Sequence, residues 1–227
     1  LQERLEQQTA TSEILRVISQ SQRDVQPVFE TIVANAGRLC EASWTVVYTF
    51  DGELINVAAA DGADPAALEV IRESYPKPPS RVGATTRAIL TRSVVHIPDV
   101  IEDPEYHLQS LARTTGYRSI MSVPMLRDGS PIGAITVVGR KPGMFSDRQI
   151  AMLQTFADQA VIAIENTRLF KELESRNRDL TESLEQQTAT SEILRVISQS
   201  QSDVQPVFEA IAANAMKLCE ASIGGVT

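Results

Sequence analysis

The chain has 227 residues, of which 43% are hydrophobic and 22% are charged. These fractions are ordinary for globular proteins, so they exclude a disordered, a collagen-like and a disulfide-framework chain. At roughly 150 residues per domain, the length predicts one domain and part of a second. Acidic residues outnumber basic ones 29 to 21, for a formal charge of −8. This balance argues against a nucleic-acid-binding surface, because such a surface must neutralise phosphates.

The cysteines and the apolar runs indicate the compartment. Two cysteines, Cys40 and Cys219, fit a reducing environment better than a secreted protein. The apolar runs are shorter than the roughly 20 residues that a membrane span needs, and no signal peptide opens the sequence. We therefore expect a cytoplasmic piece of a longer protein, with no membrane span in this fragment and no nucleic-acid partner.

An internal repeat organises the chain. Residues 5–43 return 179 positions later as 184–222, and only five of the 39 aligned pairs differ: Arg23/Ser202, Thr31/Ala210, Val33/Ala212, Gly37/Met216 and Arg38/Lys217. Solenoid repeats have periods of roughly 20–50 residues, so each period here must hold a domain and a connector. The predicted parts are a connector helix at 1–22, a domain at 23–168, a helical or coiled-coil connector at 169–203 and the truncated start of a second domain at 204–227.

Four predicted strands form two hairpins between the two copies. Each hairpin has an Asp-Gly turn, which is a strong signal for a tight connection between antiparallel strands. The strand pairs are 44–50 with 53–60, and 119–126 with 131–140. The second pair carries Val, Ile and Met on both alternating faces, so both faces of the central strands must be covered.

The available covers predict an antiparallel α+β fold. A helix that follows Asp24 has an apolar stripe at helical spacing and can bury one face. The segment 66–118 remains to cover the other face. Within it we expect a helix at 84–91, a short strand at 94–97 and otherwise irregular loops. Such a cover commonly encloses a ligand pocket.

The C-terminal part predicts one long helix. From Met144 to Gln205 there is no Gly and no Pro, a run of 62 residues, and Ser146 with Gln149 forms a capping-box pattern at its start. Heptad core positions follow, some of them polar: Phe170, Leu173, Asn177, Leu180, Leu184 and Leu194. Such an imperfect seam suits a dimeric coiled coil that shifts between states. The alternative is a single solvated helix between domains.

A series of short motifs resembles the GAF domain, a sensory module related to PAS domains. The resemblance covers 24–168 and rests on the segments 87–90, 95–100, 103–106, 116–119, 123–125, 129–135, 145–149 and 159–166. It implies five or six antiparallel strands, terminal helices that pack together as a homodimer interface, and a small-molecule pocket on the opposite face. The repeat also resembles bacterial tandem-GAF sensors, most often histidine kinases in a phosphorelay and sometimes nucleotide cyclases. A downstream kinase or cyclase domain is therefore the implied output partner.

The cofactor patterns of better-known GAF domains are mostly missing. Bilin-binding members have a Cys directly before a His, whereas Val95 precedes His96 and Tyr106 precedes His107, which argues against covalent bilin. Most of the cyclic-nucleotide constellation is also missing. His96 or His107 could be an axial haem ligand in principle, but a His in this pattern is more often structural, which argues against haem.

The polar and aromatic residues of the covering loops are the candidate ligand-binding residues, because a binding site combines an apolar body with a few converging polar groups. They are Tyr75, Arg81, His96, Asp99, Tyr106, His107, Tyr117, Arg118 and Ser119. Arg118 can pair with an anionic ligand, or it can hold Asp99 or Asp103 in an ion pair that fixes a loop. We expect no metal site, because no His, Cys and Asp cluster has ligand spacing.

The sequence carries no catalytic motif. It has two histidines and no nucleophile motif such as Gly-x-Ser-x-Gly. A GAF-type methionine sulfoxide reductase needs cysteines in the pocket loops, and 66–118 has none. Cys40 and Cys219 lie on an apolar helix face and are interpreted as core thiols.

We therefore expect a sensory module that binds an unidentified small molecule and relays a signal through dimeric helices to an output domain. The alternatives are a structural dimerisation spacer without a ligand and the sensor module of a nucleotide cyclase.

Overall fold

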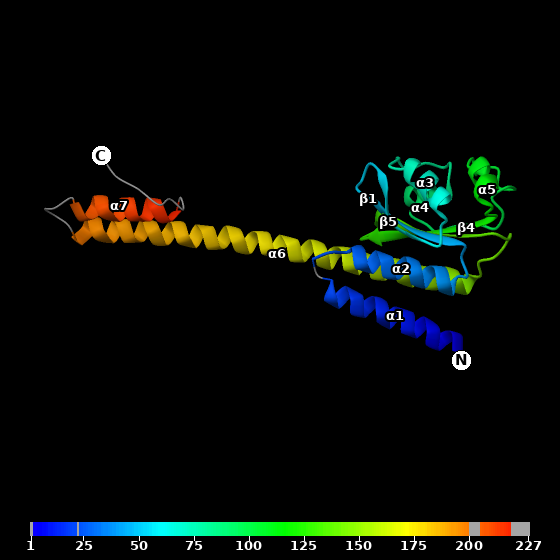
Figure 1. Ribbon diagram of the computed structural model, residues 1–227, viewed down its shortest axis with the longest axis horizontal. Coiled ribbons are helices and arrows are strands. Elements are labelled where there is room, and N and C mark those ends of the chain that lie inside the picture. The colour runs from blue at the N-terminus through cyan, green and yellow to red at the C-terminus, as the bar shows by residue number, and fades with distance from the viewer. Residues whose placement is uncertain (1, 22, 200–204, 219–227) are drawn as a thin grey trace. The chain divides into compact units, whose positions relative to one another are not determined.

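The computed structural model describes residues 2–21, 23–199 and 205–218, and Figure 1 shows its elements. In chain order these are α1 (Gln2–Gln20), α2 (Gln26–Leu39), β1 (Trp44–Phe50), β2 (Ile55–Asp61), α3 (Pro65–Glu73), α4 (Ala84–Thr91), β3 (Val95–Ile97), α5 (Gln109–Thr115), β4 (Ser119–Arg127), β5 (Ser130–Gly139), α6 (Asp147–Gln199) and α7 (Gln205–Leu218). The chain divides into two compact units, Leu1–Leu169 and Phe170–Thr227, and each is described by itself.

The five strands form one antiparallel sheet in the order β2-β1-β5-β4-β3. Both predicted hairpins are confirmed. In the turn between β4 and β5, Asp128 and Gly129 have φ angles of 50° and 76°, the left-handed geometry of a turn that matches the twist of paired strands. Between β1 and β2, Asp51 Oδ1 accepts hydrogen bonds from the backbone N–H groups of Glu53 (2.9 Å) and Leu54 (2.8 Å). The predicted antiparallel α+β fold is therefore confirmed, and of the five or six strands expected the sheet has five.

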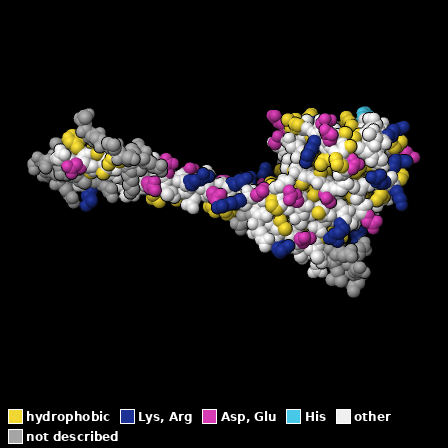
Figure 2. Space-filling model, in the orientation of Figure 1, with side chains coloured by type: hydrophobic (Ala, Val, Ile, Leu, Met, Phe, Trp, Pro, Cys, Tyr) yellow, Lys and Arg dark blue, Asp and Glu magenta, His cyan; other side chains and the backbone are white. Residues whose placement is uncertain are grey.

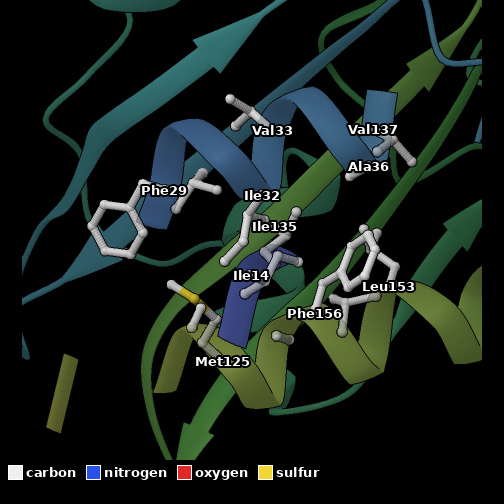
Figure 3. Packing of buried hydrophobic residues seen from close by; sticks show 14 of the residues in the cluster. Ile14, Phe29, Ile32, Val33, Ala36, Met125, Ile135, Val137, Leu153 and Phe156 are labelled. Atoms are coloured by element: carbon white, nitrogen blue, oxygen red, sulfur yellow. The ribbon is translucent and has the colours of Figure 1, made fainter. Parts of the chain in front are cut away.

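One face of the sheet packs against α1, α2 and the first part of α6, as Figure 3 shows. Met125 on β4 and Ile135 on β5 point to this side because strand side chains alternate between faces. The helices contribute Ile14, Ile32 and Phe156, each 0% exposed. Full burial of a side chain of this size stabilises a fold by about 1.5–3 kcal/mol. Helices from both ends of the first unit therefore belong to one core.

The opposite face is covered by α3, α4 and α5 with the loops between them (Figure 1). Of these helices only α4 was predicted, at 84–91, whereas α3 and α5 form where irregular loops were expected. In the structure α3 begins at Pro65, after Asp64 Oδ1 accepts a hydrogen bond from Ala67 N at 2.8 Å. An Asp followed by Pro is a usual helix start. The helix is nevertheless too short for its buried pair, Ala67 and Ile71, to form a clear periodic pattern.

The helix α6 begins with the predicted capping box. Gln149 Oε1 accepts a hydrogen bond from Ser146 N at 2.9 Å, and Ser146 Oγ accepts one from Gln149 N at 3.4 Å. Residues as far as Ala163 join the core on the sheet. In the second unit, Leu173 and Leu180 are 65% and 60% exposed. None of the helices in the described ranges is long and apolar enough to cross a bilayer.

The second unit repeats the helix boundaries of the first copy. With the offset of 179 residues, the end of α1 at Gln20 corresponds to the end of α6 at Gln199, and the bounds of α2 correspond to those of α7. Ala189 and Asn214 are buried, as are Ala10 and Asn35 in the first copy. Residues 219–227, which include Cys219, lie outside the described residues.

The face of the first unit seen in Figure 2 has a mixed surface. Lys and Arg side chains lie among Asp and Glu side chains, with hydrophobic ones scattered between them. On this face the positive charges are therefore not gathered into one continuous patch.

Candidate functional site

A cavity lies between the sheet and the cover formed by α3, α4 and α5. Trp44 and Tyr48 of β1 and Thr136 of β5 line its sheet side, because alternate strand residues share a face. The cover contributes Ile71 from α3 and Thr85 from the first turn of α4, along with side chains from the loops. Most of the lining is apolar or aromatic, and the remaining groups are mainly hydroxyls.

The cavity volume is about 60 Å³. On the same measure one water needs about 10–15 Å³, and a cavity of about 150 Å³ takes up benzene. In this conformation the cavity therefore has room for about four waters or for a molecule of a few non-hydrogen atoms. A larger ligand requires the cover to move.

All four tyrosines of the chain and its single tryptophan line this cavity. The hydroxyl oxygens of Tyr106 and Tyr117 share a hydrogen bond of 2.5 Å, and Trp44 meets the Tyr117 ring edge-on at 5.3 Å between centroids. Burial raises the pKa of Tyr117 to about 12. The pKa of Tyr106 is also raised, first by burial and then by the charge that Tyr117 would carry. Both phenols are therefore neutral at physiological pH and able to donate and accept hydrogen bonds.

A second aromatic pair, Tyr48 and Tyr75, lies beside the ammonium group of Lys77. The rings of Tyr48 and Tyr75 are 4.7 Å apart, and Lys77 Nζ lies 4.2 Å from the centre of the Tyr75 ring. The backbone of Lys77 is fixed by two hydrogen bonds with Ile55 of β2, at 2.8 and 3.2 Å. Burial lowers the pKa of Lys77 and raises that of Tyr75 to about 12. Lys77 alone carries a formal charge among the described residues that line the cavity.

A row of buried hydroxyls connects the cover to the sheet. Thr85 Oγ1 lies 2.9 Å from Thr136 Oγ1, which in turn lies 2.9 Å from Ser122 Oγ. All three residues are buried. Because each hydroxyl can donate or accept, the row can adapt its polarity to a ligand group without moving its heavy atoms.

Arg87 on α4 fixes the loop that carries Tyr106. Its Nη1 lies 3.4 Å from Asp103 Oδ2 and 3.7 Å from Glu105 Oε2. Its charge lowers the pKa of Tyr106, but less than burial raises it. Its Nη2 is buried and has no hydrogen-bond partner among the described residues. The guanidinium thus holds the loop that places Tyr106 in the cavity lining.

The cavity brings together three of the predicted ligand-binding residues, Tyr75, Tyr106 and Tyr117. Arg118 instead pairs with Asp99 and lowers the pKa of that carboxyl, which is the loop-fixing arrangement considered above. Both Arg118 and Asp99 lie outside the cavity lining.

The remaining predicted residues also lie away from the cavity. Arg81 pairs with Glu105 at the surface, at 3.1 Å, and His107 is exposed. His96 lies beside Phe145 on the helix side of the sheet, with 6.3 Å between ring centroids, and burial lowers the pKa of His96. Ser119 is buried, and its Oγ has no partner among the described residues. Neither histidine lines the cavity.

Several lining residues are not among the predicted ones, above all Trp44, Tyr48, Lys77, Thr85 and Thr136. Trp44 and Tyr48 had a usable signal, since they are four residues apart on one strand and must share a face. Thr136 also had one, as a polar residue between Ile135 and Val137. Lys77 had none, because its position depends on pairing with a distant strand.

The described lining residues offer hydroxyls and one ammonium group as binding groups. No thiol or carboxylate belongs to a described residue that lines the cavity, and the described residues contain no group of three His, Cys, Asp or Glu suited to a metal ion. Cys40 lies in the core on the helix side of the sheet, and burial raises the pKa of this thiol to about 12. A thiol with such a pKa is protonated and inert at neutral pH.

A five-stranded sheet with terminal helices on one face and a covered cavity on the other defines a class of small sensory α+β domains. The family model of the GAF domain matches residues 24–164, more than half of the chain. The chain therefore belongs to the GAF family. No curated protein matches it.

Several solved structures share the fold. A free methionine-R-sulfoxide reductase from Neisseria meningitidis is 18% identical with a TM-score of 0.59, over 72% of this chain and 90% of that chain. The GAF domain of a phosphoenolpyruvate-protein phosphotransferase from Acinetobacter is 15% identical with a TM-score of 0.59, over 73% and 97%. A domain assigned to a two-component sensor histidine kinase from Sinorhizobium meliloti is 18% identical with a TM-score of 0.50, over 64% and 93%. Identities this low indicate a shared fold and leave the activity open.

Proposed function

We propose that this chain is a regulatory GAF module that binds a small organic anion in the cavity and relays its presence through paired terminal helices. The parent protein in this proposal is a cytoplasmic bacterial tandem-GAF sensor whose output is a histidine kinase in a phosphorelay. A nucleotide cyclase is the alternative output. The observation that carries the proposal is the convergence of every tyrosine and the single tryptophan on one cavity.

An aromatic wall of this kind is unusual for a filler core. Tyr and Trp combine a large apolar surface with a polar tip, and here five such side chains face one small volume. The helix-side core is filled by side chains without a hydroxyl, such as Ile14, Ile32 and Phe156. The tyrosine hydroxyls instead offer hydrogen bonds to a molecule in the cavity.

The charge of the lining favours an anion. Lys77 is the charged lining residue, and its pKa is lowered because burial disfavours its cation. A bound carboxylate would offset that cost, since opposite charges at close range favour the ionised forms. A cationic ligand would find no carboxylate among the described lining residues.

The sheet offers a physical link from the cavity to the helices. On β5, Thr136 faces the cavity, whereas its neighbours Ile135 and Val137 face the core with α6. At the end of β4, Arg127 pairs with Glu165 of α6 at 2.7 Å. Because protein interiors are close-packed, a ligand that shifts these strands biases the packing of α6.

The part of α6 in the second unit supports the proposed homodimer. Leu173, Leu180, Leu184 and Leu194 are 55–65% exposed, and they fall on the two predicted heptad core positions. Of the other predicted core residues, Asn177 is exposed and Phe170 is half-buried. Exposed leucines in heptad register suit burial against a second copy. The Sinorhizobium meliloti neighbour, from a protein described as a sensor histidine kinase, supports the kinase as output.

The fluorescence of Trp44 tests the ligand proposal, because this is the single tryptophan and it lines the cavity. The purified chain is titrated with acetate, propionate and benzoate, which range from molecules small enough for a cavity of about 60 Å³ to one that is too large for it. We expect at least one monocarboxylate to change the Trp44 emission in a saturable way. Lys77→Met should weaken that binding about tenfold or more, whereas the exposed Lys141→Met serves as the matched control and should leave it unchanged.

The second candidate is a structural dimerisation spacer, and the small volume of about 60 Å³ favours it. Native mass spectrometry of the gently purified chain separates the two. A retained small molecule supports the sensor. An apo mass alone, together with a Trp44 signal that none of the three carboxylates changes, would contradict the ligand proposal and favour the spacer.

A further inference from the structure

The second copy of the repeat carries nearly the same apolar face that covers the sheet in the first unit. Of the eight buried residues that α1 and α2 place in the helix-side core, seven recur unchanged 179 positions later, and the exception is Val33, which is replaced by Ala212. Phe29 is 2% exposed, whereas its equivalent Phe208 on α7 is 45% exposed. The described part of the second unit contains helices only. Its helix pair 181–218, described over 181–199 and 205–218, is therefore nearly a duplicate of α1 and α2 in sequence, and its apolar face is exposed at Phe208.

Such a duplicate creates a problem of selection. The exchange of an identical element between copies is a low-cost route to association, and a head-to-tail exchange whose rotation does not close extends into an open filament. The sheet of one molecule must therefore distinguish its own pair, α1 and α2, from the pair 181–218 of a second copy. Most of the contact residues cannot make that distinction because they are the same.

Gly37 is one of the few differences, and its position is sterically restricted. A Cβ atom on Gly37 would lie 3.3 Å from Thr45 Oγ1 and 3.7 Å from Asp61 Oδ2. Thr45 is 0% exposed and is paired with Asp61 across β1 and β2. Glycine is a poor helix former compared with methionine, so its presence here fits the close approach of α2 to the strands. Met216 in the second copy would bring three further side-chain atoms beyond Cβ to this contact.

Val33 lies one turn before Gly37 on the same face of α2, and it is 3% exposed. The second copy has the small residue at this position, Ala212, and the large one at the next, Met216. The two helix faces thus differ by the transfer of volume from one turn to the next. On this sheet, Ala at position 33 leaves a void, and Met at position 37 meets Thr45.

The other three differences are less suited to selection. Arg23 and Arg38 are exposed, and Arg38 donates a hydrogen bond to Asn35 of its own helix at 2.8 Å. Thr31 donates to Pro27 O, also within α2, at 2.8 Å. These side-chain hydrogen bonds of Thr31 and Arg38 thus stay within α2.

We infer that Val33 and Gly37 are the specificity-determining residues by which this sheet accepts α1 and α2 and rejects the near-identical helix pair 181–218 of a second copy. The partner that the surface excludes is thus another molecule of the same chain. The inference is independent of any ligand in the cavity, because it concerns the opposite face of the sheet.

The test exchanges the two pairs of residues in the full chain. The double variant Val33→Ala/Gly37→Met should lower the thermal midpoint, followed by Trp44 fluorescence, by at least about 5 °C. The quadruple variant, which adds Ala212→Val/Met216→Gly, should regain most of that loss because the second pair then fits the sheet. A rise in molar mass with concentration, measured by light scattering, identifies docking between molecules, and recovery at constant mass identifies docking within one. Both outcomes support the inference.

The matched control exchanges two other differences instead, Arg23→Ser/Arg38→Lys with Ser202→Arg/Lys217→Arg; in the first copy both of these residues are exposed. It should keep the midpoint and the mass of the unaltered chain. A double variant that does not fold still leaves the test decisive, because the quadruple variant must then recover folding. The inference is wrong if the double variant melts like the unaltered chain, or if the quadruple variant is no more stable than the double.

Discussion

Replacing Thr136 with valine removes the hydroxyl that joins the cover to the sheet while keeping the shape of the side chain. Thr136 Oγ1 makes hydrogen bonds of 2.9 Å with Thr85 Oγ1 and with Ser122 Oγ, and the three residues are at most 5% exposed. In Thr136→Val the hydroxyls of Thr85 and Ser122 stay buried, and each loses its hydrogen bond to residue 136. Each such loss costs about 1–3 kcal/mol, so we expect the free energy of unfolding to fall by about 2–6 kcal/mol.

Denaturant titration followed by Trp44 fluorescence measures this effect. Thr136→Ser is the control, because it keeps the hydroxyl and loses one methyl group, at a cost of about 1 kcal/mol. The double variant Ser122→Ala/Thr136→Val removes both members of one hydrogen bond. It should be less destabilised than the sum of its single variants, since fewer buried groups are left unpaired. If Thr136→Val were no less stable than Thr136→Ser, or if the double variant were additive, the hydroxyl row would not contribute as argued.

Three further predictions address the cavity, the sheet and the dimer. Burial raises the pKa of Tyr117 from 10.0 to about 12, so folding favours its neutral form. The contribution of Tyr117 to the free energy of unfolding should be complete below pH 10 and should be lost as the pH rises toward 12. In Tyr117→Phe the denaturant midpoint should therefore fall less steeply over this pH range than it does in the unaltered chain. Gly133→Ala should lower the thermal midpoint by more than about 5 °C, because its Cβ would lie 2.2 Å from Tyr48 O; Gly37→Ala, where the nearest atom is at 3.3 Å, should have a smaller effect. Leu173→Ser/Leu180→Ser should weaken homodimerisation at least about tenfold, as measured by analytical ultracentrifugation. The control Lys171→Ser/Arg178→Ser lies outside the heptad core positions and should leave homodimerisation unchanged. The coiled coil would be contradicted if the leucine variant dimerised normally or if the control weakened dimerisation equally.

The central sheet was predictable because its signals are local. Asp128 and Gly129 predict the β4–β5 turn. The apolar residues at alternate positions around it indicate that both faces of the sheet are buried there. The start of α6 was equally predictable, since Ser146 and Gln149 cap it within one turn. In each case, residues close together in the sequence determine the structure.

The cavity was only partly predictable because its walls come from segments that are distant in the sequence. Alternation shows that Trp44 and Tyr48 share a face, but it cannot show whether that face meets the terminal helices or the cover. Lys77 reaches the cavity through pairing of its backbone with Ile55, and neither residue has a side-chain pattern that indicates this. Arg118 could bind a ligand or Asp99 by its chemistry, and the fold brings it to Asp99.

Side chains alternate between the two faces of the sheet, and this alternation gives the proposed sensor a direct connection from the cavity to the helices. Thr136 on the cavity side is bonded covalently to Ile135 and Val137 on the helix side, so no separate linker is needed between the two faces. A ligand can bias α6 only if it binds two arrangements of β5 with different affinity. The hydroxyl row is where such a difference would arise, because Thr136 contacts both the cover and its neighbour on β4. Thr136→Val should therefore reduce a carboxylate-induced change at α6 more than Thr136→Ser does, and a label placed at the exposed Leu169 can report that change.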